Sequence, residues 1–248
     1  MTPRVGLVVP SSNVTMEIEL PALFRQHAES RPPSFHSARM RMTAVTPAAL
    51  AAMDAQADRC AVELADAQVD VLAYACLVAV MVQGPGSHRE VEQRLSEASG
   101  GTPVVSSAGA LIGTIHALGV ERVAMITPYA PALTTTVIDY LAAEDIEVVD
   151  SVSLAVTDNA AVGRLDPQRL VGLAQRLDLS RAQAVVASAC VQMPSLAAIA
   201  PIQLRTGLPT LSAAAATAWS LRRELGYEQA PGFARADASS SRERVASH

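Results

Sequence analysis

The sequence predicts an α/β fold of two pseudosymmetric lobes, each a small parallel sheet flanked by helices, with an active site in the cleft between them. Short runs of Val, Ile, Leu and Ala alternate with longer Ala-rich segments of helical period, which is typical of βαβ units and parallel strands. The same order of elements restarts near residue 122, and in both halves a strand ends in Ala-Cys. The restart predicts two lobes of one design.

Length and composition fit this fold and exclude several partners. The chain has 248 residues, half of them hydrophobic and 3% aromatic, with a formal net charge of −5 and no lysine. Since no basic stripe is present, we expect no nucleic-acid partner. No apolar run reaches the roughly 18–20 residues that span a bilayer, and no cleavable signal is visible. We therefore expect no membrane contact and a cytoplasmic location.

The first half is expected to contain four strands and four helices. Ser12 or Asn13 can cap the first helix, Pro47 fits the first turn of the second, and Gly119 closes the fourth. The strands are expected at residues 4–10, 34–42, 69–75 and 103–106, and the helices at residues 13–26, 47–67, 88–98 and 108–118.

The second half repeats this order. Gly226 closes its last helix as Gly119 closes the fourth. The strands are expected at residues 122–127, 146–154, 184–189 and 210–211, and the helices at residues 130–144, 167–177, 196–207 and 213–225.

Matching segments indicate that the second half is a diverged copy of the first. Val71-Leu-Ala-Tyr-Ala-Cys76 resembles Val185-Val-Ala-Ser-Ala-Cys190, and similar pairs occur at the first and last strands of each half. A period above 100 residues indicates a duplicated lobe rather than a solenoid. We expect an N-terminal lobe of residues 1–112 plus 208–226 and a C-terminal lobe of residues 113–207. Residues 227–248 lack an apolar period and are expected to form a disordered tail.

Two cysteines are the leading candidates for chemistry. Ligands of open α/β sheets bind beyond the carboxyl ends of the strands, which is where Cys76 and Cys190 fall. Backbone N–H groups after each strand would lower the thiol pKa and favour the thiolate. The alternative is that both are ordinary buried cysteines, as we expect for Cys60 on its helix. Three cysteines without CxxC or Cys/His spacing predict neither a disulfide framework nor a metal site.

Three further polar residues follow strands in the same way. Asn13, in Pro10-Ser-Ser-Asn13, lies at a helix N-terminus, Tyr129 follows the first strand of the second half, and Asn159 follows residues 146–154. Each side chain can donate a hydrogen bond to a carboxylate. The alternatives are a helix cap, a packed ring and a turn, respectively. Gly84-Pro-Gly86 fits either a lid hinge or a plain turn.

On these residues the sequence resembles the maleate cis–trans isomerases of the aspartate/glutamate racemase superfamily, which also contains the arylmalonate decarboxylases. The resemblance covers about residues 4–226. The segments that carry it are Pro10-Ser-Ser-Asn-Val-Thr-Met-Glu17, Tyr74-Ala-Cys-Leu-Val-Ala79, Arg122-Val-Ala-Met-Ile-Thr-Pro-Tyr129, Asp158-Asn159 and Ala189-Cys-Val-Gln-Met-Pro194.

The resemblance implies an enzyme with no metal and no organic cofactor that acts on a small dicarboxylate. It makes Cys76 the nucleophile and Cys190 its partner, and a homo-oligomer, a dimer, is expected. The residues implied in substrate binding are Asn13, Tyr129 and Asn159, together with Leu77, Val78 and Val191 beside the two cysteines.

The residues at the two cysteine sites differ from those of the related racemases and decarboxylases, which favours the isomerase function. The amino-acid racemases usually carry Cys-Asn-Thr and Gly-Cys-Thr where this chain has Cys76-Leu-Val and Cys190-Val-Gln. The decarboxylases have a small residue, typically glycine, in place of Cys76. The implied reaction is the isomerisation of maleate to fumarate: a thiolate adds to the alkene, the resulting single bond rotates, and the thiolate leaves.

Three alternatives stay open on the sequence alone. One is a racemase or epimerase with two thiols as opposed acid and base. Another is an arylmalonate-type decarboxylase, which the presence of Cys76 disfavours. The third is a two-lobed protein that binds a dicarboxylate without chemistry.

Overall fold

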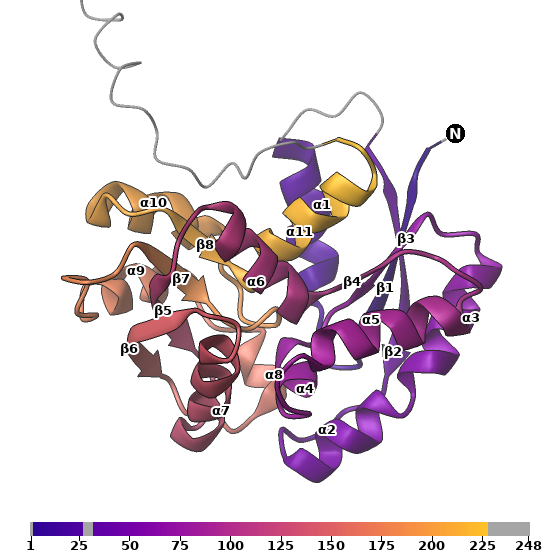
Figure 1. Ribbon diagram of the computed structural model, residues 1–248, viewed down its shortest axis with the longest axis horizontal. Helices are drawn as coiled ribbons and strands as arrows, with labels where there is room; N and C mark the ends of the chain where they lie inside the picture. Colours follow the sequence, from indigo (N-terminus) through magenta and orange to yellow (C-terminus); the bar gives the residue numbers. More distant parts are fainter. Residues whose placement is uncertain (1, 27–31, 228–248) are drawn as a thin grey trace, which may run out of the picture.

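The computed structural model describes residues 2–26 and 32–227 and contains two lobes side by side (Figure 1). Each lobe has a four-stranded parallel sheet, with strand order β2-β1-β3-β4 in the first and β6-β5-β7-β8 in the second. Since the two orders correspond strand for strand, the predicted fold of two similar α/β lobes is confirmed.

The first lobe follows the predicted alternation of strands and helices. Its strands are β1 (Arg4–Pro10), β2 (Ser34–Met40), β3 (Val71–Tyr74) and β4 (Val104–Ser106). Its helices are α1 (Thr15–Gln26), α2 (Pro47–Asp54), α3 (Ala57–Asp66), α4 (Leu77–Met81) and α5 (Ser87–Ala98), and α6 (Ser107–Ala117) leads to the second sheet.

The second lobe repeats the arrangement. Its strands are β5 (Arg122–Thr127), β6 (Glu147–Ser153), β7 (Ala184–Ser188) and β8 (Thr210–Ser212). Its helices are α7 (Pro131–Ala142), α8 (Asn159–Val162), α9 (Gln168–Ala174), α10 (Leu196–Thr206) and α11 (Ala213–Glu224).

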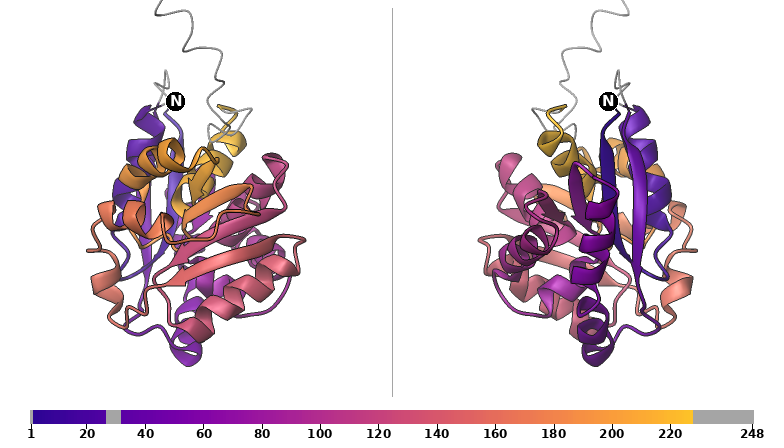
Figure 2. Two further views of the ribbon diagram at one scale, coloured as in Figure 1. Left: turned by 90° about the vertical axis from the view of Figure 1, so that its left-hand side faces the viewer. Right: turned by 90° about the vertical axis from the view of Figure 1, so that its right-hand side faces the viewer.

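The central strands form the core of each lobe. Every residue of β3 and of β7 is buried, and only the first residue of β1 and of β5 is not. Strands covered by helices on both faces must be apolar throughout, which is why these segments are continuous Val, Ile, Leu and Ala runs. Figure 2 shows the strands of each lobe packed among its helices from two further sides. No helix of the described residues is both long enough and apolar enough to cross a membrane.

One predicted helix is two helices in the structure. Residues 47–67 are interrupted at Gln56, whose side chain turns toward the end of β2. There its oxygen accepts from Arg41 N at 3.0 Å, and its amide donates to Arg41 O at 3.3 Å and Ala52 O at 3.0 Å. The interruption depends on contacts with a strand 15 residues away. The short helices α4 and α8 were also absent from the prediction.

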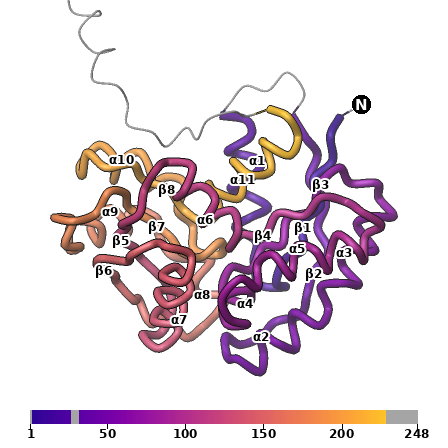
Figure 3. Tube along the Cα trace, viewed as in Figure 1, coloured from indigo at the N-terminus to yellow at the C-terminus, as the bar shows by residue number. Residues whose placement is uncertain are grey.

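The predicted lobe boundary needs one correction. Residues 208–226 were assigned to the N-terminal lobe, but β8 pairs with β7 in the second sheet. Its following helix α11 then leaves that sheet and packs against α1, α6, β3 and β4. Figure 3 traces this crossing to the side of α1. Strand β8 pairs with the edge of the second sheet, whereas helix α11 covers an apolar surface of the first lobe. Residues 228–248 of the predicted tail lie outside the described residues.

Candidate active site

All eight residues predicted at the site line one small cavity between the lobes. The cavity has a volume of about 20 Å³, which is room for about one water molecule. Its walls come from the loops that follow β1, β3, β5, β6 and β7. The predicted residues on them are Asn13, Cys76, Leu77, Val78, Tyr129, Asn159, Cys190 and Val191.

Cys76 lies between β3 and α4 and is 5% exposed. It occupies the N-cap position of α4 and forms no side-chain cap hydrogen bond, but the nearby backbone N–H of Ala79 acts to lower its pKa. This is the backbone donor that the sequence led us to expect. The net effect is opposite to the expectation, however, because burial outweighs this donor and raises the pKa of the Cys76 thiol to about 12. In the unliganded site Cys76 is therefore a thiol rather than a thiolate.

Cys190 occupies the equivalent place after β7 and is 7% exposed. Burial raises its pKa as well, while the hydroxyl of Tyr129 and the N–H groups of Gln192 and Met193 donate to its sulfur and lower it. The Ser188 hydroxyl accepts from Cys190 N at 3.3 Å and donates to Cys190 O at 2.7 Å, which fixes the turn. Each lobe thus supplies one buried thiol with donors of its own.

Asn13 is fully buried and uses only part of its hydrogen-bonding capacity. Its oxygen accepts from Met16 N at 3.2 Å, as a helix cap does. Its amide nitrogen is buried without an acceptor. A buried unsatisfied donor costs about 1–3 kcal/mol. The amide donor on the cavity wall is therefore available for an anionic ligand.

Asn159 joins the lobes beside the cavity. Its amide donates to Ser12 Oγ at 2.5 Å, and its carbonyl accepts from the Gln192 side chain. Gln192 is fixed from the first lobe, because Thr15 Oγ1 donates to its carbonyl at 2.7 Å. The sequence prediction did not include Gln192, although Cys190-Val-Gln is where this chain departs from the racemases.

A larger, mainly apolar chamber adjoins the small cavity. Its volume is about 460 Å³, and it shares Val45, Tyr129, Asn159 and Cys190 with the inner cavity. Residues 44–47, between β2 and α2, form one wall. None of its lining residues is an Asp, Glu, Lys, Arg or His. The chamber gives a ligand a route to the thiols.

Two other sequence features lie away from the cavity. Gly84-Pro-Gly86 forms the turn between α4 and α5, and both glycines have positive φ (+106° and +80°), a conformation that favours glycine. Cys60 is fully buried in the core, as predicted. Within the described residues no group of three or more His, Cys, Asp or Glu side chains is arranged to hold a metal ion.

Comparisons with known proteins match nearly the whole chain. Residues 5–236 match a family model described as arylmalonate decarboxylase. The chain is 52% identical over 232 residues to a maleate isomerase of Geobacillus stearothermophilus, covering 91% of this chain and 92% of the relative.

Two solved structures are similar over nearly the whole chain. One is a variant of the maleate isomerase Iso from Pseudomonas putida S16 with maleate (TM-score 0.90, 47% identity, 93% and 95% of the two chains covered). The other is a mutant of Nocardia farcinica maleate cis–trans isomerase with a covalently bound succinylcysteine intermediate (TM-score 0.89, 46% identity, 95% and 99% covered).

Proposed function

The chain belongs to the family described as arylmalonate decarboxylase and, within it, to the maleate isomerases, and we propose from this membership that it converts maleate into fumarate through a covalent cysteine adduct. The observation that carries the proposal is the pair of buried thiols, one from each lobe, on the wall of a single cavity. No cofactor has a role in the proposed chemistry.

The reaction needs a nucleophile because the π bond of maleate prevents rotation. In our proposal the sulfur of Cys76 bonds to one alkene carbon, and the π electrons move to the other carbon and its carboxylate. Rotation about the resulting single bond and expulsion of the sulfur re-form the double bond in the trans arrangement. This divides one difficult step into easier ones.

Burial of both thiols suggests how protons move in this reaction. Addition of a neutral thiol across the double bond gives a succinyl thioether, with the sulfur on one carbon and a proton on the other. The mutant of the Nocardia enzyme contains a covalently bound succinylcysteine intermediate. We assign delivery and removal of that proton to Cys190, assisted by its hydrogen bond from Tyr129. Cys190 can recover a proton from Cys76, so the step balances without an external acid.

The neighbouring donors are suited to a dicarboxylate. The unpaired amide of Asn13, with Asn159 and Tyr129 on the same wall, would hold the carboxylates and stabilise charge that develops during addition. Leu77, Val78 and Val191 would complete the pocket around the carbon chain. One carboxylate has to remain bound while the other rotates.

The decisive experiment is an NMR time course of the purified protein with maleate in deuterated buffer, without added metal or cofactor. We expect the maleate signal to be replaced by that of fumarate. Cys76→Ala should form no fumarate, whereas Cys60→Ala, which changes a buried cysteine of the core, should retain turnover. Proton exchange without fumarate would indicate a racemase-type activity instead, and a Cys76→Ala protein of near wild-type rate would refute the assignment of the nucleophile.

The homodimer and the cytoplasmic location expected from the sequence belong to the proposal too. Light scattering after size exclusion checks the first: a dimer should have about twice the chain mass of 25.9 kDa. Fractionation of the source cells checks the second.

A further inference from the structure

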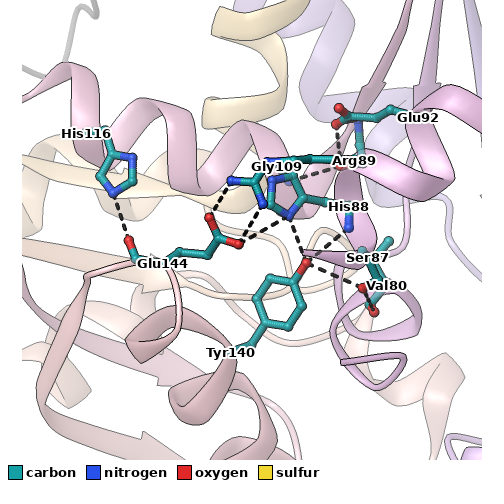
Figure 4. A network of polar contacts seen from close by, with 10 residues as sticks. Val80, Ser87, His88, Arg89, Glu92, Gly109, His116, Tyr140 and Glu144 are labelled. Carbon is teal, nitrogen blue, oxygen red and sulfur yellow. Dashed lines mark hydrogen bonds and ion pairs between the residues drawn. The ribbon is translucent and has the colours of Figure 1, made fainter. Parts of the chain in front are cut away.

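Tyr140 places its hydroxyl at the junction of the two lobes (Figure 4). The residue lies on α7 of the second lobe and is 2% exposed. Its oxygen is 2.8 Å from His88 Nδ1, 3.1 Å from His88 N and 3.4 Å from Ser87 Oγ. Ser87 and His88 form the first turn of α5 in the first lobe. A phenol of one lobe therefore contacts a helix N-terminus of the other.

This contact replaces a missing helix cap. The N-cap residue of α5 is Gly86, which has no side chain to accept from the first N–H groups. Because a backbone N–H can only donate, the Tyr140 oxygen must accept from His88 N. Tyr140 thus performs for α5 the function that a serine or aspartate usually performs at the N-cap.

The remaining bonds follow from the available donors. The Ser87 hydroxyl donates to Val80 O at 2.7 Å, so the Tyr140 proton is directed to His88 Nδ1 at the shorter distance. His88 is then neutral, with its proton on Nε2. Burial lowers the pKa of His88, with a smaller contribution from Arg89 in the same direction, while Glu144 acts against both. The assigned tautomer agrees with that direction.

Ser87 connects this contact to the nucleophile. Its bond to Val80 O joins α5 to α4, and α4 begins directly after Cys76 and carries the Ala79 N–H that acts to lower the Cys76 pKa. At the other end of α7, Tyr129 precedes the helix and donates to Cys190. Tyr140 therefore lies on a set of helices, α4, α5 and α7, that connects the surroundings of both thiols.

We propose that Tyr140 is a positioning residue for the isomerisation: by capping α5 across the lobe boundary it holds α4, and with it the Ala79 N–H, in place against Cys76. The inference rests on the proposed function, in which the Cys76 sulfur gives up its proton and gains negative charge as it adds to the alkene. Hydrogen bonds to ionised groups are strong and depend on geometry. Cys76 has few such donors, and the nearby Cys190 and Asp54 both oppose its ionisation. A small displacement of α4 should therefore slow addition.

A second contact between the same helices provides a matched control. Arg89 of α5 forms a bidentate ion pair with Glu144, at 2.9 and 2.6 Å, just beyond the end of α7. The Glu144 carbonyl also contacts His116 Nε2 at 2.9 Å. The Glu144 carboxylate also lies 4.0 Å from His88 Nδ1, but it forms no bond to His88 N, to Ser87 or to α4. Glu144→Gln consequently weakens docking while it leaves the cap of α5 intact.

The experiment compares the wild-type protein with Tyr140→Phe and Glu144→Gln. Two quantities are measured: kcat and KM for maleate, and the rate at which iodoacetamide alkylates Cys76 in the unliganded protein from pH 7 to 10, followed by peptide mass. For Tyr140→Phe we expect kcat and the alkylation rate at each pH to fall about tenfold, equivalent to about 1.4 kcal/mol. KM should stay within about twofold, because Tyr140 does not line the cavity.

Glu144→Gln should leave both quantities within about twofold while its Tm falls. Ser87→Ala removes the bond to Val80 O and should lower kcat and the alkylation rate as Tyr140→Phe does. This variant tests the proposal if Tyr140→Phe does not fold. Wild-type kinetics and wild-type alkylation in Tyr140→Phe, or equal losses in Glu144→Gln, would overturn the proposal. If the wild-type protein forms no fumarate, the proposed function fails, and alkylation alone still tests the effect of Tyr140 on Cys76.

Discussion

At the scale of the residue, Asn13 combines a structural and a binding function in one amide. Its oxygen caps α1, and its nitrogen is buried without a partner. The unfavourable free energy of that unpaired donor is removed when a carboxylate accepts from it. The same burial that costs stability in the unliganded protein thus favours binding of an anion.

Replacing Asn13 by Asp separates these two functions. Asp caps a helix as well as Asn does, so we expect Asn13→Asp to fold, with a Tm lowered by several degrees because its carboxylate is buried without a partner. The donor is lost, however, and a carboxylate faces the substrate, so kcat/KM for maleate should fall about 100-fold or more, equivalent to about 3 kcal/mol. Calorimetry and steady-state kinetics measure the two effects. An active Asn13→Asp protein would show that the amide does not bind the substrate.

The raised pKa of Cys76 makes a prediction about pH. Because the pKa is about 12, only a small fraction is thiolate at neutral pH, and below the pKa that fraction grows tenfold for each pH unit. Alkylation of Cys76 in the unliganded protein should therefore rise about tenfold per unit from pH 7 to 10 without levelling off. Iodoacetamide labelling with peptide mapping measures it. A plateau below pH 9 would mean that the donors around the sulfur outweigh burial.

At the scale of the element, the sequence predicts the helices and strands that a local residue pattern determines. It misses the features that depend on contacts between distant parts of the chain. Continuous apolar runs gave the strands, since a strand covered on both faces must be apolar along its length. The interruption between α2 and α3 was missed because Gln56 bonds to the end of β2. The sheet assignment of residues 210–212 failed because the pairing partner of so short a strand is set by the fold.

The same distinction applies to the candidate site. The two Ala-Cys strand ends could be predicted as neighbours because the half-chains are duplicates, and the cavity brings both thiols together. The place of Gln192 in the site could not be predicted, because the residues that it contacts, Ser12 and Thr15, are about 180 residues away in the chain. The direction of the Cys76 pKa was also missed, because burial depends on the closed interface of both lobes.

Helix α10 illustrates an element completed by the other lobe. Glu19 of α1 accepts from Ser195 N at 2.6 Å and Leu196 N at 2.8 Å, and so caps α10 across the lobe boundary. Glu19→Ala should lower the free energy of unfolding by about 2–4 kcal/mol, because both N–H groups lose their acceptor. Glu19→Gln keeps an acceptor oxygen and should stay within about 1 kcal/mol of the wild-type value. Urea denaturation distinguishes them, and equal stability of both variants would contradict the capping role.

At the scale of the whole molecule, the lobes enclose a cavity smaller than a four-carbon diacid. The cavity of about 20 Å³ adjoins the chamber of about 460 Å³, so a substrate must widen the inner space toward the chamber. The cavity walls come from both lobes, and contacts such as Thr15 to Gln192 join them there. A ligand with two carboxylates can therefore bridge the lobes and stabilise their closed arrangement.

Succinate tests this bridging without turnover, because it has two carboxylates and no double bond to accept a thiol. At about 100 times its Kd, a ligand that binds only the folded state stabilises it by about 2.7 kcal/mol, which for a chain of this size raises the Tm by roughly 5–10 °C. We expect such a rise with succinate at constant ionic strength, little change with propionate, and loss of the succinate effect in Asn13→Asp. Scanning calorimetry measures all three. Equal shifts with propionate and succinate would mean that one carboxylate suffices and that the ligand does not bridge the lobes.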